Sequence, residues 1–168
     1  MKALLAGLFT AVIALFFLIR RSRLNMKITE NFRLGEFVAT STGLYNYPDE
    51  EVIKKIVFTA KNVAQPLRDR FGALKITSGY RSRAVNEKVG GVENSRHKTG
   101  EAFDVVPVDI SIDELYEGMQ KLNLPIKKVL YSVTGKTKWL HVEPDFSGKE
   151  VATLYLKDDE VGAGYDFG

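Results

Sequence analysis

The sequence predicts an α+β domain in which helices flank a mostly antiparallel sheet. Apolar residues recur at helical spacing through residues 53–71. Two strand-like segments, 127–133 and 137–143, are separated by a short turn that contains Gly135, as in a hairpin. Short apolar strands precede this hairpin, and a mixture of helices and adjacent hairpin strands is typical of the α+β class.

The two expected helices have recognisable beginnings. Residues 48–51 place a proline and three acids in the first turn of the longer helix, where proline fits and negative charge complements the helix dipole. That helix should run through residues 53–71, with a kink at Pro66. Residues 111–114 form a capping box that begins a second helix, which should continue to about Leu122.

The expected strands follow the longer helix. Residues 74–77 read as a short strand and residues 101–108 as a buried one. The hairpin comes next, and a last strand is expected near residues 152–156. The acidic, glycine-containing segment 158–168 is expected to be a mobile tail, so residues 26–157 form the predicted domain.

The N-terminal segment has the composition of a membrane helix. Residues 3–19 are apolar or small except Thr10, and three arginines follow between positions 20 and 23. This length matches the roughly 17–25 residues that cross a bilayer, and no small-x-small cleavage pattern precedes the arginines. We therefore expect residues 1–25 to be a transmembrane anchor, with a cleaved signal peptide or a buried hydrophobic arm as alternatives.

The charge distribution narrows the possible partners. The chain has a formal net charge of +3, and four positive charges without any acid lie in residues 1–25, which leaves −1 for the remainder. A near-neutral domain lacks the basic surface of a nucleic-acid-binding protein. The arginines after the apolar run would by charge bias hold the domain in the cytoplasm, so the orientation of the anchor stays open. The chain has no cysteine, which excludes disulfides and thiolate ligands.

The two histidines of the chain suggest a metal site. His97 and His141, with Asp104, supply the two imidazoles and one carboxylate of a catalytic zinc site, in which water takes the fourth position. Gly100 lets the backbone fold between His97 and Asp104, and the small Ala102 leaves space for an ion. The spacing of these residues alone leaves an alternative, in which His97 is a surface or hydrogen-bonded histidine that binds no metal.

These residues carry a family resemblance. Ser95-x-His97-x-x-Gly100-x-Ala102-x-Asp104, followed by Trp139-x-His141, resembles the zinc D-alanyl-D-alanine carboxypeptidase family of peptidoglycan peptidases. That family includes D-Ala-D-Ala dipeptidases and phage L-alanyl-D-glutamate endopeptidases, and it shares its fold with the hedgehog signalling domain. The similarity covers about residues 28–156, and residues 31–37 look like the start of the small, phage-associated branch.

The resemblance implies a hedgehog/DD-peptidase-like fold and assigns roles to individual residues. The zinc ligands fall on His97, Asp104 and His141, and the substrate-binding arginine falls on Arg81. A guanidinium can hold a carboxylate or an oxyanion with paired hydrogen bonds, although Arg81 could also be a solvated loop residue.

Two further residues are candidates for substrate binding. Ser95 either orients His97, touches substrate or is a turn residue. Trp139 either forms the base of the substrate cleft or belongs to the core.

The expected general base departs from the family pattern. Such peptidases usually place an acid three residues before the second histidine, or a histidine two before it, and these positions hold Lys138 and Trp139. Neither side chain accepts a proton at neutral pH. Glu143 is the best substitute, because it should project from the same strand face as His141. The alternative is an exposed carboxylate at the end of a strand.

The sequence thus leads to one expected function and one alternative. We expect a membrane-anchored zinc peptidase that faces the cell wall, in the periplasm or at the cell surface. It would hydrolyse peptidoglycan stem or cross-link peptides as a D-Ala-D-Ala carboxypeptidase or an L-Ala-D-Glu endopeptidase. The alternative is an inactive zinc-binding protein that binds the wall or belongs to a phage particle.

Overall fold

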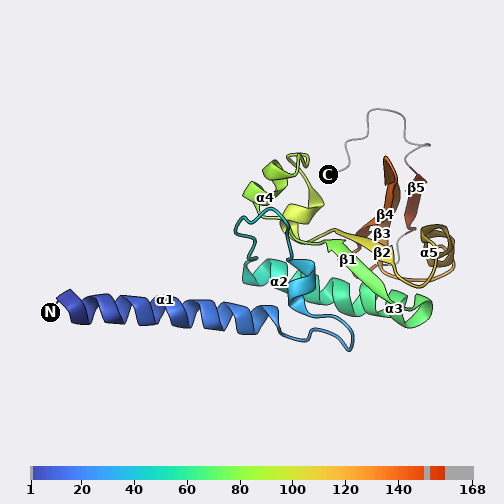
Figure 1. Cartoon of the computed structure of the whole chain (residues 1–168). Helices are drawn as coiled ribbons and strands as arrows, with labels where there is room; N and C mark the ends of the chain where they lie inside the picture. The colour runs from blue at the N-terminus through green and yellow to red at the C-terminus, as the bar shows by residue number, and fades with distance from the viewer. Residues whose placement is uncertain (1, 150–151, 158–168) are drawn as a thin grey trace.

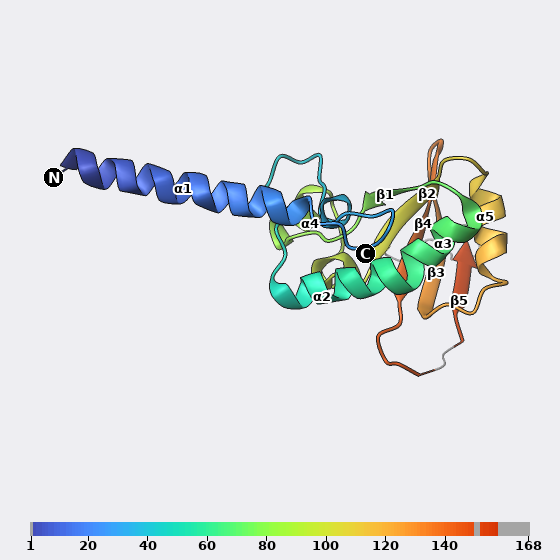
Figure 2. The same cartoon turned by 90° about the horizontal axis from the view of Figure 1, so that it is seen from below.

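The fold is seen in a computed structural model that describes residues 2–149 and 152–157, with the side chains of residues 2–8, 10 and 17 outside this description (Figure 1). The mobile tail expected over residues 158–168 lies outside the described residues. Figures 1 and 2 show a long first helix that projects from a domain built of one sheet and several helices.

The elements follow one another in mixed order. The helices are α1 (Lys2–Leu24), η1 (Leu34–Phe37), α2 (Glu50–Thr59), η2 (Ala60–Ala64), α3 (Gln65–Phe71), α4 (Arg83–Lys88), η3 (Arg96–Thr99) and α5 (Ile112–Met119). The strands are β1 (Leu74–Ser78), β2 (Phe103–Pro107), β3 (Ile126–Thr134), β4 (Thr137–Pro144) and β5 (Leu154–Lys157).

The strands form one five-stranded sheet in the order β1-β2-β4-β3-β5. Three of its four pairings are antiparallel, and β5 alone pairs in parallel, with β3. The mostly antiparallel α+β class predicted from the sequence is therefore confirmed. The predicted hairpin is formed by β3 and β4, and Gly135 has a φ of 59° in its turn.

The helix beginnings agree with the predicted signals, whereas α5 ends at Met119 and not at about Leu122, and a further difference lies at Pro66. The Ser111 hydroxyl accepts a hydrogen bond from the Glu114 amide, and the Glu114 carboxylate accepts one from the Ser111 amide, so the capping box is confirmed. Pro66 lies in the first turn of α3, directly after the π-helical η2. Because proline lacks an N–H and crowds the preceding turn, the wider π turn accommodates it within a continuous helical stretch.

Three short helices were not predicted from the sequence. η1, α4 and η3 have between four and six residues each, which is too short to show helical periodicity. Of these, η3 has the greatest consequence, because it contains His97.

The hydrophobic core lies on one face of the sheet. Phe37 packs edge-to-face against both Phe32 and Phe103, with ring centroids 5.8 and 6.1 Å apart. Strand alternation sends Leu140 and Val142 into this core and leaves the intervening β4 residue on the opposite face. Helices α2, α3 and α5, with the π-helical η2, supply the other side of the core, with Ile56, Val63, Leu67, Leu115 and Met119.

The long helix α1 contacts the domain near its C-terminal end. The Arg20 guanidinium lies over the rings of Tyr45 and Tyr47, 4.2 and 4.7 Å from their centroids. Arg23 forms an ion pair with Glu50 at the start of α2. Within the described part of the chain, no helix is both long and apolar enough to cross a membrane, so the anchor expected over residues 1–25 is not supported.

Gly79 provides a test of the packing after β1. A Cβ at this position would lie only 2.2 Å from the carbonyl oxygen of Phe37. Since the obstacle is backbone, Gly79→Ala should lower the free energy of unfolding by about 2 kcal/mol or more, as overpacking does. Urea denaturation would measure this loss.

Gly43→Ala is the matched control, because Gly43 has a φ of 73° and a Cβ added there would meet no other atom within 4 Å. Only backbone strain of about 1 kcal/mol should appear there. Equal stability of the two variants would contradict the packing argument.

Candidate metal centre

His97, Asp104 and His141 lie together on the sheet face opposite the core. Asp104 Oδ1 is 3.0 Å from His141 Nδ1 and 3.4 Å from His97 Nε2, and the two ring nitrogens are 3.2 Å apart. All three residues are buried, and their facing atoms satisfy the proximity expected of metal ligands. The structure therefore brings together the three ligands predicted from the sequence.

The spacing of these atoms fits a zinc ion. Zinc binds histidine nitrogen and carboxylate oxygen at about 2.0–2.2 Å in tetrahedral geometry, which puts any two ligand atoms about 3.3–3.6 Å apart. The three observed separations lie within a few tenths of an ångström of that range. Two neutral imidazoles and one carboxylate are also a donor set that zinc prefers.

Sheet register and one glycine bring these ligands together. Asp104 in β2 lies directly opposite His141 in the antiparallel neighbour β4. His97 belongs to η3, which ends at Gly100 with a φ of 69°, a left-handed conformation that glycine adopts easily. A Cβ at Gly100 would also lie 2.8 Å from Cγ1 of Val52, so the turn needs glycine for two reasons.

His97 is held by a backbone carbonyl. Its Nδ1 lies 2.7 Å from the carbonyl oxygen of Gly79, which can only accept a hydrogen bond, so Nδ1 carries the proton. The unprotonated Nε2 then faces Asp104 and His141 as a free donor for a metal. With only 1% of its surface exposed, the ring is closely fixed.

Arg81 reaches the metal cluster through Asp104. Its Nη2 donates to Asp104 Oδ2 at 2.9 Å, and its Nε donates to the Ser78 hydroxyl at the same distance. Burial alone would raise the pKa of Asp104, but its close contacts with His97 and His141 outweigh this effect and hold that pKa well below its usual range. Arg81, which was predicted to bind substrate, therefore also holds the metal-ligand candidate Asp104 in place.

Asn46 is a structural residue of the site that the sequence did not reveal. Its side-chain amide donates to the carbonyl oxygens of Val38 and Tyr80, and its carbonyl accepts from the Ser82 amide at 2.6 Å. These bonds hold the backbone on both sides of Arg81. A single asparagine in a loop has no spacing pattern, so no sequence signal could identify it.

Glu143 lies beside the outer nitrogen of His141. Its Oε1 is 3.5 Å from His141 Nε2 and 2.5 Å from Lys128 Nζ. Burial alone would raise the pKa of Glu143, yet His141 and Lys128 lower it to about 2. In turn, burial opposes protonation of His141, while Asp104 and Glu143 raise its pKa. The general-base role of Glu143 stays a prediction, and this placement does not favour it.

The remaining predicted residues have different surroundings. Ser95 is buried, and its hydroxyl has no hydrogen-bond partner within the described residues. Trp139 is half-buried on the strand face of His141. Lys138 is exposed on the opposite face, where its Nζ lies 5.5 Å from the centroid of the Tyr131 ring. Lys138 therefore points away from the ligand cluster.

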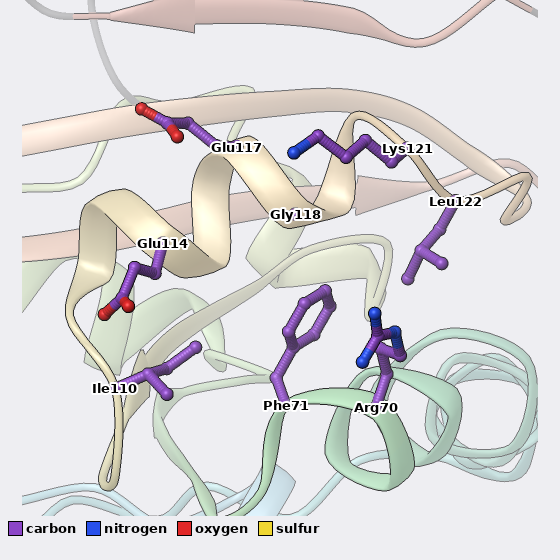
Figure 3. A pocket seen from close by; sticks show the side chains of 8 residues that line it. All are labelled: Arg70, Phe71, Ile110, Glu114, Glu117, Gly118, Lys121 and Leu122. Atoms are coloured by element: carbon purple, nitrogen blue, oxygen red, sulfur yellow. The ribbon is translucent and has the colours of Figure 1, made fainter.

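One groove lies beside Glu143, the neighbour of His141, and another cavity is remote from the metal ligands. The groove has a volume of about 620 Å³, and its lining includes Ser95, Lys128 and Glu143. Figure 3 shows the remote cavity, of about 670 Å³, between the end of α3 and α5. Phe71, Gly118 and Lys121 are among the residues around it, and none of the metal ligands is.

Comparison with known proteins gives one family match. The family model described as Peptidase M15 matches residues 31–143, which is more than half of the chain. The matched range contains His97, Asp104 and His141, and it begins just before η1. No curated protein matches the chain.

The geometry predicts the metal content of the protein. The full chain should copurify with about one zinc ion, and His97→Ala should lose most of it, because two remaining ligands hold zinc far more weakly than three. Elemental analysis of the purified protein measures the ratio.

Asp113→Asn removes an exposed carboxylate of α5 and is the matched control, with zinc content expected to stay unchanged. Full zinc occupancy in the His97→Ala protein would refute the ligand assignment.

Proposed function

Because the chain belongs to the M15 family of peptidases, we propose that it is a zinc-dependent peptidase of peptidoglycan stem or cross-link peptides. The observation that carries this proposal is the His97, Asp104 and His141 cluster, whose atom spacing fits zinc. Family membership supports zinc-dependent peptide hydrolysis, and the wall substrate follows from the resemblance of the sequence motifs. The bond cleaved would be of the D-Ala-D-Ala or the L-Ala-D-Glu type.

The chemistry of the site follows from its charges. Zinc, when bound, activates water and polarises the scissile carbonyl. Two neutral imidazoles and one carboxylate would cancel only part of the charge of a zinc ion. The remaining positive charge would attract the carbonyl oxygen of a substrate. Asp104 supplies the single negative charge, and Arg81 holds its outer oxygen in place.

Arg81 is well placed to bind substrate as well as Asp104. A guanidinium has five N–H donors, and the bonds to Asp104 and Ser78 use only Nε and Nη2. Its remaining donors can hold a substrate carboxylate or a developing oxyanion beside the metal ligands. Such a contact would strengthen as negative charge develops on the substrate.

A non-catalytic zinc protein is the second candidate function. One observation in its favour is that positions 138 and 139 hold no acid that could act as the general base. The other is that, among the described residues, the candidate metal cluster contains Asp104 as its one carboxylate. Such a protein would bind the wall, or form part of a phage particle, without hydrolysing peptides. In either case, contact with peptidoglycan requires the domain to lie on the wall side of the membrane or on a virion.

Digestion of purified peptidoglycan tests the proposed activity. The zinc-loaded full chain should release new amino and carboxyl ends, and a chelator should abolish the release, because removal of zinc removes the activated water. Mass spectrometry of the products identifies the cleaved bond. Zinc-loaded protein that binds peptidoglycan but releases no ends would support the non-catalytic function instead.

Substitution of Arg81 tests the role of its guanidinium. Arg81→Ala should lower kcat/KM by about 10²–10³-fold, the usual effect of removing one donor to a developing oxyanion. Steady-state kinetics on a purified wall peptide would measure the loss.

Arg83→Ala is the matched control, since Arg83 is exposed and pairs only with Glu87 among the ion pairs of the described residues. Activity of Arg81→Ala equal to that of Arg83→Ala would remove Arg81 from the mechanism.

A further inference from the structure

We infer that Glu143 and Lys128 form a clamp that orients His141 for metal binding, so that Glu143 is a positioning residue. The inference rests on the proposed zinc centre and adds two residues to it. It replaces the proton-accepting role that the sequence suggested for Glu143.

The two ring nitrogens of His141 have different neighbours. Nδ1 faces the ligand cluster, 3.0 Å from Asp104 Oδ1 and 3.2 Å from His97 Nε2. Nε2 faces Glu143 Oε1 at 3.5 Å. Since the two nitrogens of an imidazole project in diverging directions, Glu143 contacts the side of the ring that faces away from the cluster.

Sheet register holds Glu143 in this place. Glu143 in β4 lies directly opposite Lys128 in β3, and Lys128 Nζ contacts the same Oε1 that faces His141. Cross-strand partners of opposite charge stabilise each other in this arrangement. Because only 7% of Glu143 is exposed, its carboxylate depends on these two neighbours for compensation of its charge.

The clamp determines which nitrogen of His141 is available to a metal. Both ring nitrogens of His141 face a carboxylate, Asp104 Oδ1 at Nδ1 and Glu143 Oε1 at Nε2. With a metal bound to Nδ1, the ring proton would have to lie on Nε2, where Glu143 can accept its hydrogen bond. The 3.5 Å separation is about half an ångström longer than an ordinary hydrogen bond, so in this structure Glu143 is a close polar neighbour of Nε2. Glu143 thereby offsets the attraction of Asp104 for a proton on Nδ1 and supports the tautomer that a metal needs.

His97 is oriented by the same principle through a different group. There the Gly79 carbonyl accepts the proton of Nδ1 and leaves Nε2 for the metal. The two histidines thus use opposite ring nitrogens, and each has an acceptor on its outer side. Glu143 is the counterpart of the Gly79 carbonyl, with a charge that makes His141 the stronger donor.

Proton transfer by Glu143 is disfavoured by the same geometry. A general base must lie within about 2.6–3.2 Å of the water it deprotonates, or reach it through one further water. The oxygen of Glu143 that faces the site is already engaged by Lys128 and lies at the outer edge of the His141 ring.

The test is the zinc affinity of the full chain, measured by competition with a chromogenic chelator. Glu143→Leu removes the acceptor and should weaken zinc binding by about 10–100-fold, the usual effect of losing an outer partner of a ligating histidine. Glu143→Gln keeps an acceptor oxygen, so its loss of affinity should be smaller.

Glu101→Gln is the matched control, because Glu101 is also a partly buried carboxylate paired with two cations, Lys55 and Arg96. Its zinc affinity should equal that of the unmodified protein. Cobalt-loaded protein gives a second measure, since the visible spectrum of cobalt should change in Glu143→Leu and stay the same in Glu101→Gln.

Unchanged zinc affinity in Glu143→Leu would overturn the inference. It would also be overturned if Glu143→Gln binds zinc normally but loses turnover by about 10²–10⁴-fold, as expected for loss of a general base. The measurement of zinc affinity needs no substrate. If the protein has no peptidase activity, the proposed function is refuted, and the role of Glu143 in zinc binding can still be tested.

Discussion

The register between β2 and β4 is the constraint on which the site depends. It places Asp104 directly opposite His141, so two of the three ligands are fixed by backbone hydrogen bonds of a central sheet pair. A shift of one residue would turn His141 toward the core and Leu140 toward the site, because neighbouring side chains of a strand point to opposite faces. The packing of Leu140 and Val142 in the core therefore also selects the geometry of the metal ligands.

The third ligand depends on loops that the sheet does not itself determine. η3 and the turn after β1 hold each other, since the Arg81 amide donates to the His97 carbonyl and the His97 ring donates to the Gly79 carbonyl. Asn46 adds a third loop to this arrangement through its bonds to Tyr80 and Ser82. Buried polar groups of this kind keep their positions because each finds a partner.

Sequence patterns predicted the ligands better than their surroundings. His97, Asp104 and His141 were predicted because their residue types and motif spacing are specific, and the alternation of β4 correctly put Glu143 on the face of His141. The pairing of Glu143 with Lys128 depends on the register across a hairpin. A one-residue change of turn would alter it, so the pairing could not be predicted from either strand alone.

Two other features could not be predicted from the sequence. The contact of Arg81 with Asp104 joins residues 23 positions apart, and it depends on how the turn after β1 packs against η1. Pro66 was predicted to kink the long helix, but the structure has a π-helical segment directly before it in a continuous helical stretch, a form that no residue pattern indicates.

The ion pair between Arg81 and Asp104 has a consequence for coordination number. A carboxylate can bind a metal through one oxygen or through both, and the second mode takes an additional position around the ion. Here the Arg81 guanidinium occupies Oδ2 and leaves Oδ1 alone facing the imidazoles. Asp104 would therefore offer a bound metal one oxygen only, which would leave a coordination position for a molecule that is not part of the protein.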